Sequence, residues 1–471
     1  MSNQPILVWF RNDLRLEDHA ALTNALKTGR PVIPVYLHTP ASESPWARGE
    51  ASRWWLHHAL ADFAGQVEQK GGQLILRSGK DPESLLQGLI AETHAEAVYW
   101  NRRYDPSGIA VDKHLKQTLP AKSFSGSLLH EPHKIATQSG GHYKVYTPFY
   151  KNMMAMGDPE DPLPVPKPFR FPDAFPKSES LASWRLLPEL DWDAGFSELW
   201  DPSAKGMAER VDAFLEEAVG DYKKDRDFPG EDGTSRMSPY LHFGQVSPRM
   251  LWHAASEAVS RHGVSEKGVD AWQRQLVWRD FAMHLLYHEP HLDRKPMQEK
   301  FHAFPWEENS EGLRAWQRGE TGYPIVDAGM RALWATGWMH NRVRMIVASF
   351  LVKDLRIHWL EGAEWFWDTL VDADLANNSF GWQWAAGCGA DAAPYFRIFN
   401  PVLQGKKFDG DGAYIRKWIP ELRDVPDRYL HAPWEMDPPP KAYPAPIVDH
   451  GEARDRALEA LSSLTEATDD T

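Results

Sequence analysis

Hydroxyl and guanidinium groups gather in one short segment of this 471-residue chain. Thr234, Ser235, Arg236 and Ser238 lie within five residues of one another. Side-chain hydroxyls, a guanidinium and the backbone N–H groups of a helix start together favour binding of a pyrophosphate. Taken alone, the segment also fits an ordinary capped helix start, so both interpretations stay open.

A second group combines two carboxylates and an amide, at Asp372, Asp374 and Asn378. Residues two and six apart do not share one face of a helix cleanly, so a solvated acidic turn is the plain interpretation. A third feature is tryptophan, with 22 residues in the chain. Composition alone favours an indole-rich helical core, and stacking surfaces for a flat ligand or an extruded base are the alternative.

The first part of the chain predicts alternating strands and helices. The expected strands are residues 5–10, 32–37, 73–76 and 97–100, and the expected helices are residues 20–26, capped by Asp18, and 82–92. Strands separated by helices of this length predict a Rossmann-like parallel sheet with right-handed crossovers. The turn at residues 11–15 contains no glycine, so the dinucleotide fingerprint is absent and a nucleotide cofactor is expected elsewhere.

The rest of the chain follows other patterns. Seven prolines within residues 157–177 exclude a helix or a central strand and predict an extended connector. From about residue 205 the apolar spacing is helical, with expected helices at 208–219, 269–287, 324–338 and 342–359. We therefore expect an α/β domain over 1–135, an extended proline-rich linker over 136–204 and an all-α domain over 205–471.

The composition limits the class of protein. A net charge of −14 argues against non-specific nucleic-acid binding by the average surface, although it is compatible with a local basic patch. Because no apolar run is long enough to span a bilayer and no secretory signal is recognisable, we expect a cytoplasmic protein that binds no membrane. The single cysteine, Cys388, excludes an intramolecular disulfide and a thiolate metal cluster, and no metal site is expected.

Several long motifs occur in an order that one known family shares. They are GTSRMSPYLHFG (233–244), GWMHNRVRM (337–345) and DADLANNSFGWQW (372–384), preceded by VWFRNDLR (8–15) and YKVYTPF (143–149). Together they resemble the DNA photolyase and cryptochrome family, in particular bacterial class I cyclobutane pyrimidine dimer photolyases, over essentially residues 5–450. The resemblance implies an antenna-binding α/β domain followed by an all-α domain that binds FAD and DNA.

The resemblance assigns a set of FAD-binding residues. Asp372 would pair with Arg344, since a buried carboxylate needs a partner and a guanidinium offers two hydrogen bonds. Asp374 would face the N3 edge of the flavin, and Asn378 would face N5, where a neutral amide can bond either protonation state of that nitrogen. The full set is Tyr222, Thr234, Ser235, Arg236, Met237, Ser238, Arg279, Trp338, Arg344, Asp372, Asp374 and Asn378.

Three tryptophans match the electron relay of the family, namely Trp306, Trp359 and Trp382. The resemblance implies that they carry an electron from the surface to oxidised flavin. Indole is among the few side chains that can be oxidised reversibly to a radical, which is the physical reason for tryptophan at such positions. The alternative is that all three are structural core residues.

The resemblance also implies that a monomeric enzyme binds UV-damaged DNA and flips the damaged bases out of the duplex, as photolyases do. Trp278, Trp384 and Met345 would pack the flipped dimer, while Asn341 and Arg342 would bind base edges or phosphate. Further cations expected along the DNA groove are Arg226, Arg397, Lys406, Lys407, Arg416 and Lys417.

One residue departs from the pattern of the dimer photolyases, which carry glutamate where this chain has Gln275. Glutamine resembles the enzymes that repair (6-4) photoproducts, whereas His340, Asn341 and Met345 match the dimer enzymes. We therefore expect light-driven repair of cyclobutane dimers by electron transfer from excited reduced FAD, with (6-4) repair as the alternative. A cryptochrome-type photoreceptor is a further alternative, disfavoured because only 25 residues follow Pro446.

An antenna chromophore is also expected in the first domain. Folate-binding relatives carry an Asn-Glu pair where this chain has Ser107 and Gly108. They also carry a basic residue nearby, which is Arg294 in this chain. We expect 5,10-methenyltetrahydrofolate, with 8-hydroxy-5-deazaflavin, or no antenna, as the alternatives.

Overall fold

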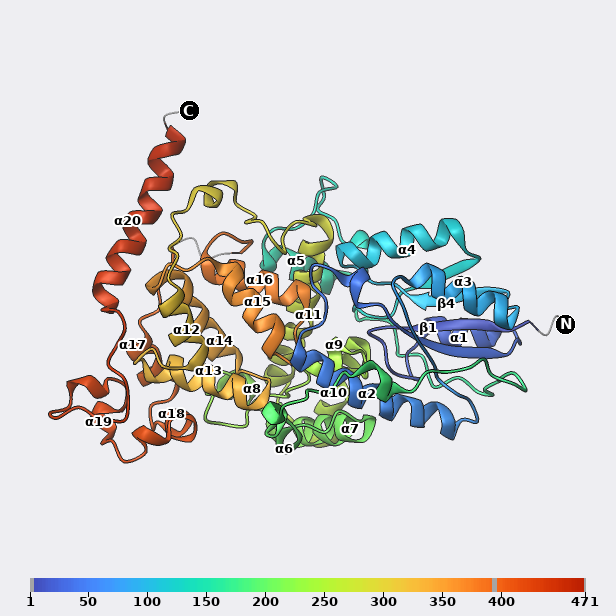
Figure 1. Ribbon diagram of the computed structural model, residues 1–471, viewed down its shortest axis with the longest axis horizontal. Coiled ribbons are helices and arrows are strands. Elements are labelled where there is room, and N and C mark those ends of the chain that lie inside the picture. The colour runs from blue at the N-terminus through green and yellow to red at the C-terminus, as the bar shows by residue number, and fades with distance from the viewer. Residues whose placement is uncertain (1–3, 392–395, 470–471) are drawn as a thin grey trace.

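The computed structural model describes residues 4–391 and 396–469, and it contains an α/β part and a helical part (Figure 1). The five parallel strands, in the spatial order β3-β2-β1-β4-β5, are β1 (Ile6–Phe10), β2 (Val32–His38), β3 (Ile75–Ser78), β4 (Ala97–Asn101) and β5 (Ala121–Phe124). The helices that alternate with them are α1 (Ala20–Lys27), α2 (Glu50–Gln69), α3 (Pro82–Thr93) and α4 (Pro106–Thr118). The expected parallel sheet is confirmed. The prediction missed β5, whose sequence Ala-Lys-Ser-Phe contains no apolar run.

The prediction that Asp18 caps the first helix is wrong. His19 is the N-cap residue of α1, and its Nδ1 accepts the N–H of Leu22. Asp18 is fully buried with a φ of 46° and instead binds two residues of the helical part, Arg249 (2.5 Å) and Ser247 (2.5 Å). A buried carboxylate needs charged partners, and this one finds them across the junction of the two parts.

The proline-rich connector is extended over residues 157–180, where the structure has no helix or strand. Main-chain hydrogen bonds tie it to the α/β part, from Val32 N to Arg170 O (2.8 Å) and from Asp18 N to Leu163 O (2.7 Å). The flanking residues of the expected linker are not extended. They form α5 (Tyr146–Ala155), α6 (Phe196–Leu199) and two short 3-10 turns, Leu181–Trp184 and Asp191–Asp193.

The helical part contains no strand within the described residues after 205. Its helices are α7 (Ala204–Ala213), α8 (Tyr222–Asp225), α9 (Ser238–His242), α10 (Pro248–His262), α11 (Glu266–His288), α12 (Ser310–Arg318), α13 (Pro324–Thr336), α14 (Asn341–Ser349), α15 (Trp359–Thr369), α16 (Leu375–Ala386), α17 (Pro401–Phe408), α18 (Ala413–Trp418), α19 (Asp427–Leu430) and α20 (His450–Asp469). In Figure 1, α20 lies at the end of the molecule opposite the sheet.

The single helix predicted over residues 342–359 is wrong. A π-helical turn, Phe350–Asp354, follows α14, and the chain then leaves the helix at Arg356, which has a φ of 49°. A new helix, α15, begins at Trp359, where Nδ1 of His358 accepts the N–H of Leu360 (3.1 Å). This break brings Trp359 to the first position of a helix instead of the last.

The two parts share one core. A single cluster of buried side chains includes Phe10 of β1, Trp55 of α2, Tyr240 of α9 and Phe281 of α11. Gly244 has a φ of 65°, and a Cβ there would overlap the backbone of Asn12, so the close contact requires glycine. A second buried cluster lies within the helical part and includes residues of α13, α14, α15 and α16.

Candidate functional site

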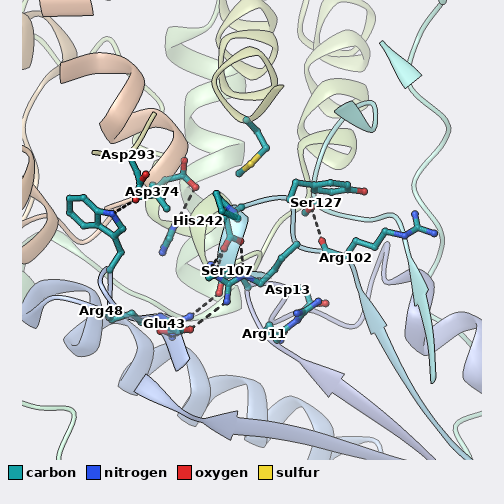
Figure 2. Close-up of a pocket in the computed structure, with 18 of the residues that line it drawn as sticks. Arg11, Asp13, Glu43, Arg48, Arg102, Ser107, Ser127, His242, Asp293 and Asp374 are labelled. Carbon is teal, nitrogen blue, oxygen red and sulfur yellow. Dashed lines mark hydrogen bonds and ion pairs between the residues drawn. The ribbon is translucent and has the colours of Figure 1, made fainter. Parts of the chain in front are cut away.

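A cavity of about 290 Å³ lies between the sheet and the helical part (Figure 2). The α/β part contributes residues that follow β1, β2 and β4, and the helical part contributes residues of α9, α11 and α16. The lining includes Arg11, Asp13, Glu43, Trp46, Arg48, Tyr104, Ser107, His242, Arg279, Asp293, Trp367 and Asp374. Two of the residues expected at the flavin, Arg279 and Asp374, therefore line this cavity.

Asp374 is the N-cap residue of α16, and its Oδ1 accepts the N–H of Asn377 (2.9 Å). Burial by itself would raise the pKa of Asp374, but the neighbouring His242 and Arg279 outweigh burial and hold this pKa below its ordinary value. One turn later, Nδ2 of Asn378 donates to Ala363 O (2.9 Å). The carboxylate of Asp374 is thus ionised. The amide of Asn378 is held through its Nδ2, and this bond does not use its Oδ1.

The structure contains the expected pair of Arg344 and Asp372. Nη2 of Arg344 lies 2.8 and 3.1 Å from the two carboxylate oxygens, and its Nε donates to Met339 O (2.7 Å). Asp372 is 8% exposed, so the guanidinium supplies the partner that a buried carboxylate requires.

The hydroxyl-rich segment precedes and begins α9. Arg236 has a φ of 50°, its guanidinium lies 5.5 Å above the Trp338 ring, and its Nη2 lies 2.9 Å from Asp232. Oγ of Ser235 accepts from Trp272 Nε1 (3.2 Å). Met237 and Tyr222 are buried, at 2% and 7% exposure.

Three buried nitrogen atoms near this segment, Arg236 Nε, His340 Nε2 and Arg342 Nε, have no hydrogen-bond partner within the described chain. Burial lowers the pKa of His340 to about 4. The charge of Asp227 opposes this shift and those of Arg342, Arg344 and Arg236 reinforce it, so the imidazole is neutral near pH 7. Unpartnered guanidinium N–H groups beside side-chain hydroxyls fit an anionic ligand such as the pyrophosphate of FAD. The residues present therefore fit the cofactor.

The three tryptophans of the expected relay lie in one cluster of the helical part. Trp382 and Trp359 are 2% and 1% exposed, whereas Trp306 is half-buried. The His358 ring centroid lies 5.0 Å from that of Trp306 and 5.7 Å from that of Trp359. Trp382 packs against Gly362, three residues after Trp359 on α15, where a Cβ would overlap its ring. The set thus extends from the core to the surface.

The residues expected to face damaged bases lie on α11, α14 and α16. Nη2 of Arg226 donates to Oε1 of Gln275 (3.2 Å), whose Nε2 donates to Ala271 O (2.9 Å). Asn341 Nδ2 and Arg342 Nη1 each lie 3.8 Å from the sulfur of Met345. Phe380 of α16 contacts Trp278 (centroids 5.8 Å apart), and Trp384 lies one turn later on the same helix.

Most of the expected basic residues are exposed. Arg397, Lys406, Lys407 and Lys417 are on the surface, while Arg342 is half-buried above the Phe408 ring (4.3 Å) and bound to Asp227 (2.7 Å). Arg416 is different, because its guanidinium binds Asp427 (2.6 Å) and the backbone oxygens of Asp411, Arg423 and Val425. Arg416 thus joins segments of its own domain, and we do not retain it among the DNA-binding cations.

Of the expected antenna positions, Ser107 lines this cavity, whereas Gly108 lines a smaller crevice beside it. Ser107 and Gly108 are in the first turn of α4, where both bind the carboxylate of Asp105. A Cβ at Gly108 would lie 2.5 Å from Cβ of Arg103, so glutamate does not fit there without a change in the backbone. Arg294 lies 5.2 Å above the Trp46 ring, and Nε1 of Trp46 donates to Asp293 (2.7 Å).

Some lining residues carry no signal in the sequence. Trp46 and Trp367 reach the cavity from segments far apart in the chain, and neither lies in one of the motifs. His242, which also lines the cavity, lies inside the motif at 233–244, and Tyr146, which contacts Trp278, lies inside the motif at 143–149, so these motifs were the available indications for both. Among the described residues, no three His, Cys, Asp or Glu side chains are arranged to hold a metal ion, and no helix has the length and apolar character needed to cross a bilayer.

Comparison with known proteins is consistent with this geometry. Residues 6–168 match the sequence model of DNA photolyase, and residues 272–463 match that of the FAD binding domain of DNA photolyase. The chain is 49% identical to a deoxyribodipyrimidine photo-lyase of Agrobacterium fabrum over 99% of this chain and all of that protein. It is 35% identical to cryptochrome-1 of Arabidopsis thaliana, over 97% of this chain and 70% of that one.

A crystal structure of a bacterial class III photolyase from Agrobacterium tumefaciens superposes with a TM-score of 0.94 and 48% identity, covering 99% of this chain and 98% of that one. The subclass of that protein is thus class III, whereas the motifs pointed to class I. The family is the same in either case. Both matched regions and the full-length relatives lead to one conclusion: the chain belongs to the DNA photolyase and cryptochrome family.

Proposed function

We propose that the protein repairs cyclobutane pyrimidine dimers in UV-damaged DNA under light, with FAD bound in the helical part. Similar proteins are named deoxyribodipyrimidine photo-lyases, and the match to the FAD-binding domain supports the cofactor. The observation that carries the choice of lesion is the state of His340, which is 3% exposed and has its pKa lowered to about 4. A neutral, buried imidazole is a poor proton donor at neutral pH.

The chemistry explains why that observation decides between lesions. Bound reduced FAD supplies one electron to the lesion under light and regains it afterwards, so repair has no net redox change. In a cyclobutane dimer the two carbon–carbon bonds between the pyrimidines break, and no proton has to be delivered. Repair of a (6-4) product requires proton movement at a histidine, which His340 is not suited to provide.

The residues of the chain would bind and orient the flavin and the damaged bases. Asp374, held ionised, would accept a hydrogen bond from the flavin, and Oδ1 of Asn378 would accept one beside it. Trp278, Trp384 and Met345 would pack the two saturated pyrimidine rings and exclude water.

Gln275 would act as a neutral hydrogen-bonding group that Arg226 orients. A glutamate at this position would keep the acceptor and gain an ion pair with Arg226. Gln275→Glu is therefore expected to preserve or improve dimer repair, as measured by dimers repaired per photon.

We further propose that Trp306, Trp359 and Trp382 conduct an electron from the surface to the cofactor. The half-buried Trp306 and the buried Trp359 and Trp382 support Trp306 as the surface end of this relay. Electron transfer through the buried pair needs no proton exchange with water, since reversible oxidation of indole can leave the N–H in place.

For the antenna we propose 5,10-methenyltetrahydrofolate in the part of the cavity that Trp46, Asp293 and Ser107 line, since Arg279 and Asp374 of the same cavity are assigned to the flavin. The crevice at the carboxyl ends of the strands, where nucleotides usually bind in such sheets, has only about 30 Å³ and is crossed by the pairs Arg48–Glu43 and Arg103–Glu43. The larger cavity offers the Trp46 indole for stacking and the Asp293 carboxylate for a ring amine. These features favour a pterin over a deazaflavin nucleotide, although Gly108 excludes the glutamate of other folate sites.

The decisive experiment illuminates the reduced holoprotein with oligonucleotides that carry one lesion each. We expect the cyclobutane dimer to be repaired and the (6-4) product to persist. Repair of only the (6-4) product would overturn the choice of lesion. Repair of neither would favour a photoreceptor, an alternative that the similarity to plant cryptochromes supports. We also retain 1–135, 136–204 and 205–471 as the proposed domains.

A further inference from the structure

Trp278 is held among three aromatic rings, one of which comes from outside the helical part. The ring centroids of Tyr146 and Trp278 are 3.5 Å apart with an interplanar angle of 5°. Phe380 and Phe281 contact the same indole at 5.8 Å, one tilted and one edge-on. Trp278 nevertheless stays half-buried, so part of the indole remains accessible.

Tyr146 is itself rigidly placed. It is 7% exposed, its hydroxyl donates to Arg274 O (3.1 Å), and its ring stacks on Tyr150 (5.9 Å, 27°). Tyr150 in turn donates to Asp270 (3.1 Å) and lies under the Arg274 guanidinium (4.4 Å). Asp270 and Arg274 lie on α11, two turns and one turn before Trp278. The helix that carries the indole therefore also fixes the ring that packs against it.

The tyrosine belongs to a segment that follows α11 over much of its length, residues 127–150, which we term the strap. Ser127 O accepts from Arg279 (2.8 Å), and the N–H groups of Leu129 and His130 donate to Asp280 (2.8 and 3.1 Å). Tyr143 N donates to His284 (3.1 Å). The strap lies outside residues 272–463, which match the FAD-binding domain. The support for Trp278 thus comes from the first part of the chain.

We propose that Tyr146 is a positioning residue of the lesion pocket, which fixes the plane of Trp278 before DNA binds. This inference rests on the proposed function, because it takes Trp278 as a contact of the damaged bases. A half-buried indole without the stack would sample several rotamers, and binding would have to select one of them. The stack selects that rotamer in the free protein, so less side-chain entropy is lost when the damaged bases bind.

The test compares Tyr146→Phe, which keeps the ring, with Tyr146→Leu, which removes it. Tyr143→Leu is the matched control, because it removes a tyrosine of the same strap whose ring lies against Phe149 and His284 instead of Tyr146 or Trp278. The measurement is the affinity of the FAD-loaded protein for an oligonucleotide with one cyclobutane dimer and for the undamaged strand. We expect Tyr146→Leu to bind the dimer about 3- to 10-fold more weakly, with undamaged DNA unaffected. Tyr146→Phe and Tyr143→Leu should keep the wild-type preference for the dimer.

A double-mutant cycle with Trp278→Leu separates positioning from a general loss of structure. If Tyr146 acts through the indole, Tyr146→Leu has no further effect on dimer binding once Trp278 is replaced. Additive losses would overturn the proposal, as would an unchanged preference in Tyr146→Leu. Should Tyr146→Leu not fold, Tyr146→Met replaces it in the same cycle, since methionine keeps bulk without a plane.

The same measurements distinguish this inference from the proposed function. A wild-type protein that binds damaged and undamaged DNA equally would contradict the proposed function and, with it, the role of Trp278. A wild-type protein that prefers the dimer, together with a Tyr146→Leu variant that does so equally, would contradict only the positioning role.

Discussion

At the scale of single residues, Asn378 illustrates how one hydrogen bond orients a functional group. Its Nδ2 donates to Ala363 O, which leaves Oδ1 for a ligand. We predict that Asn378→Leu lowers the stability of reduced flavin, because the acceptor beside N5 is lost. A hydrogen bond is worth about 0.5–1.5 kcal/mol, or roughly 20–65 mV for a one-electron couple. Redox titration followed by visible absorbance measures the change.

The matched control is Asn24→Leu. Asn24 makes the same kind of bond, from its amide to Ala20 O (2.8 Å), on α1 and away from the cavity. Its flavin potential should equal that of the wild type. An unchanged potential in folded Asn378→Leu would remove Asn378 from its proposed role.

Trp306 is the exposed end of the proposed relay. We predict that Trp306→Phe slows light-driven reduction of oxidised FAD, since phenylalanine is much harder to oxidise than tryptophan. Repair by chemically reduced protein should stay close to wild type, because that reaction does not use the relay. Trp418→Phe, a change in the same apolar cluster, is the control. Equal photoreduction in Trp306→Phe and the control would mean that electrons enter elsewhere.

The residue scale also separates what the sequence predicts from what it does not. Asp372 and Arg344 lie in two recognisable motifs, and simple charge compensation predicts their pairing. The contact of Tyr146 with α11 joins positions 128 residues apart, and its partner Arg274 contributes only a backbone oxygen. Because every residue has a backbone oxygen, the sequence does not indicate which one accepts this bond, and only the folded chain shows it. Arg416 shows the reverse, since an exposed-looking cation proves to bind its own domain.

At the scale of elements, the approach of α15 and α16 depends on Gly362. A Cβ at this position would overlap the Trp382 ring, whereas a Cβ at Gly381 on α16 would have nothing within 4 Å. We predict that Gly362→Ala destabilises the fold by about 1–3 kcal/mol through overpacking and slows photoreduction by displacing Trp382. Gly381→Ala should be neutral or stabilising by up to about 1 kcal/mol. Thermal unfolding and photoreduction rates of the two variants provide the comparison, and equal stability would contradict the packing argument.

The strap meets α11 at a carboxyl group whose charge depends on pH. Burial raises the pKa of Asp280 to about 7, although Arg279 and the N–H groups of His130 and Leu129 oppose it. The folded protein therefore holds a proton that the unfolded chain has released between about pH 4 and pH 7. Stability contributed by this proton is complete at low pH and is lost as the pH rises towards 7.

Asp280→Asn tests this linkage, because one amide oxygen can accept both backbone bonds that Oδ2 now accepts. The stability of the variant relative to the wild type should increase by up to about 1.4 kcal/mol per pH unit between pH 5 and pH 7. Unfolding midpoints measured across this range give the slope. A difference that does not change with pH would show that Asp280 stays ionised.

Prediction of helices and strands from the sequence succeeded where the apolar periodicity was strong. It failed where contacts or backbone angles that leave no periodic pattern determine the element. The strands β1, β2 and β4 are apolar runs and were expected, while β5 is polar and owes its place to pairing with β4. The break between α14 and α15 depends on the φ of Arg356 and on the capping ring of His358. Neither feature changes the helical spacing of apolar residues.

At the scale of the whole molecule, an acidic protein is proposed to bind a polyanion. The net charge of −14 repels DNA on average, so binding has to come from a local surface. Exposed Lys406 and Lys407 lie on α17, next to Phe408, whose ring packs under Arg342 of the lesion set. This helix therefore places positive charge beside the proposed pocket of a protein whose net charge is negative.

Lys406→Gln tests whether this surface binds phosphate. We predict weaker binding to damaged and undamaged DNA by the same factor, because a phosphate contact carries no information on the lesion. The slope of log affinity against log salt should fall in magnitude by about 0.9 for each phosphate of duplex DNA that the variant no longer neutralises. Lys113→Gln on α4 is the matched control, an exposed lysine of the α/β part that should leave the slope unchanged. If both variants keep the wild-type slope, α17 does not bind the DNA backbone, whereas a weakening confined to damaged DNA would move Lys406 into the lesion pocket.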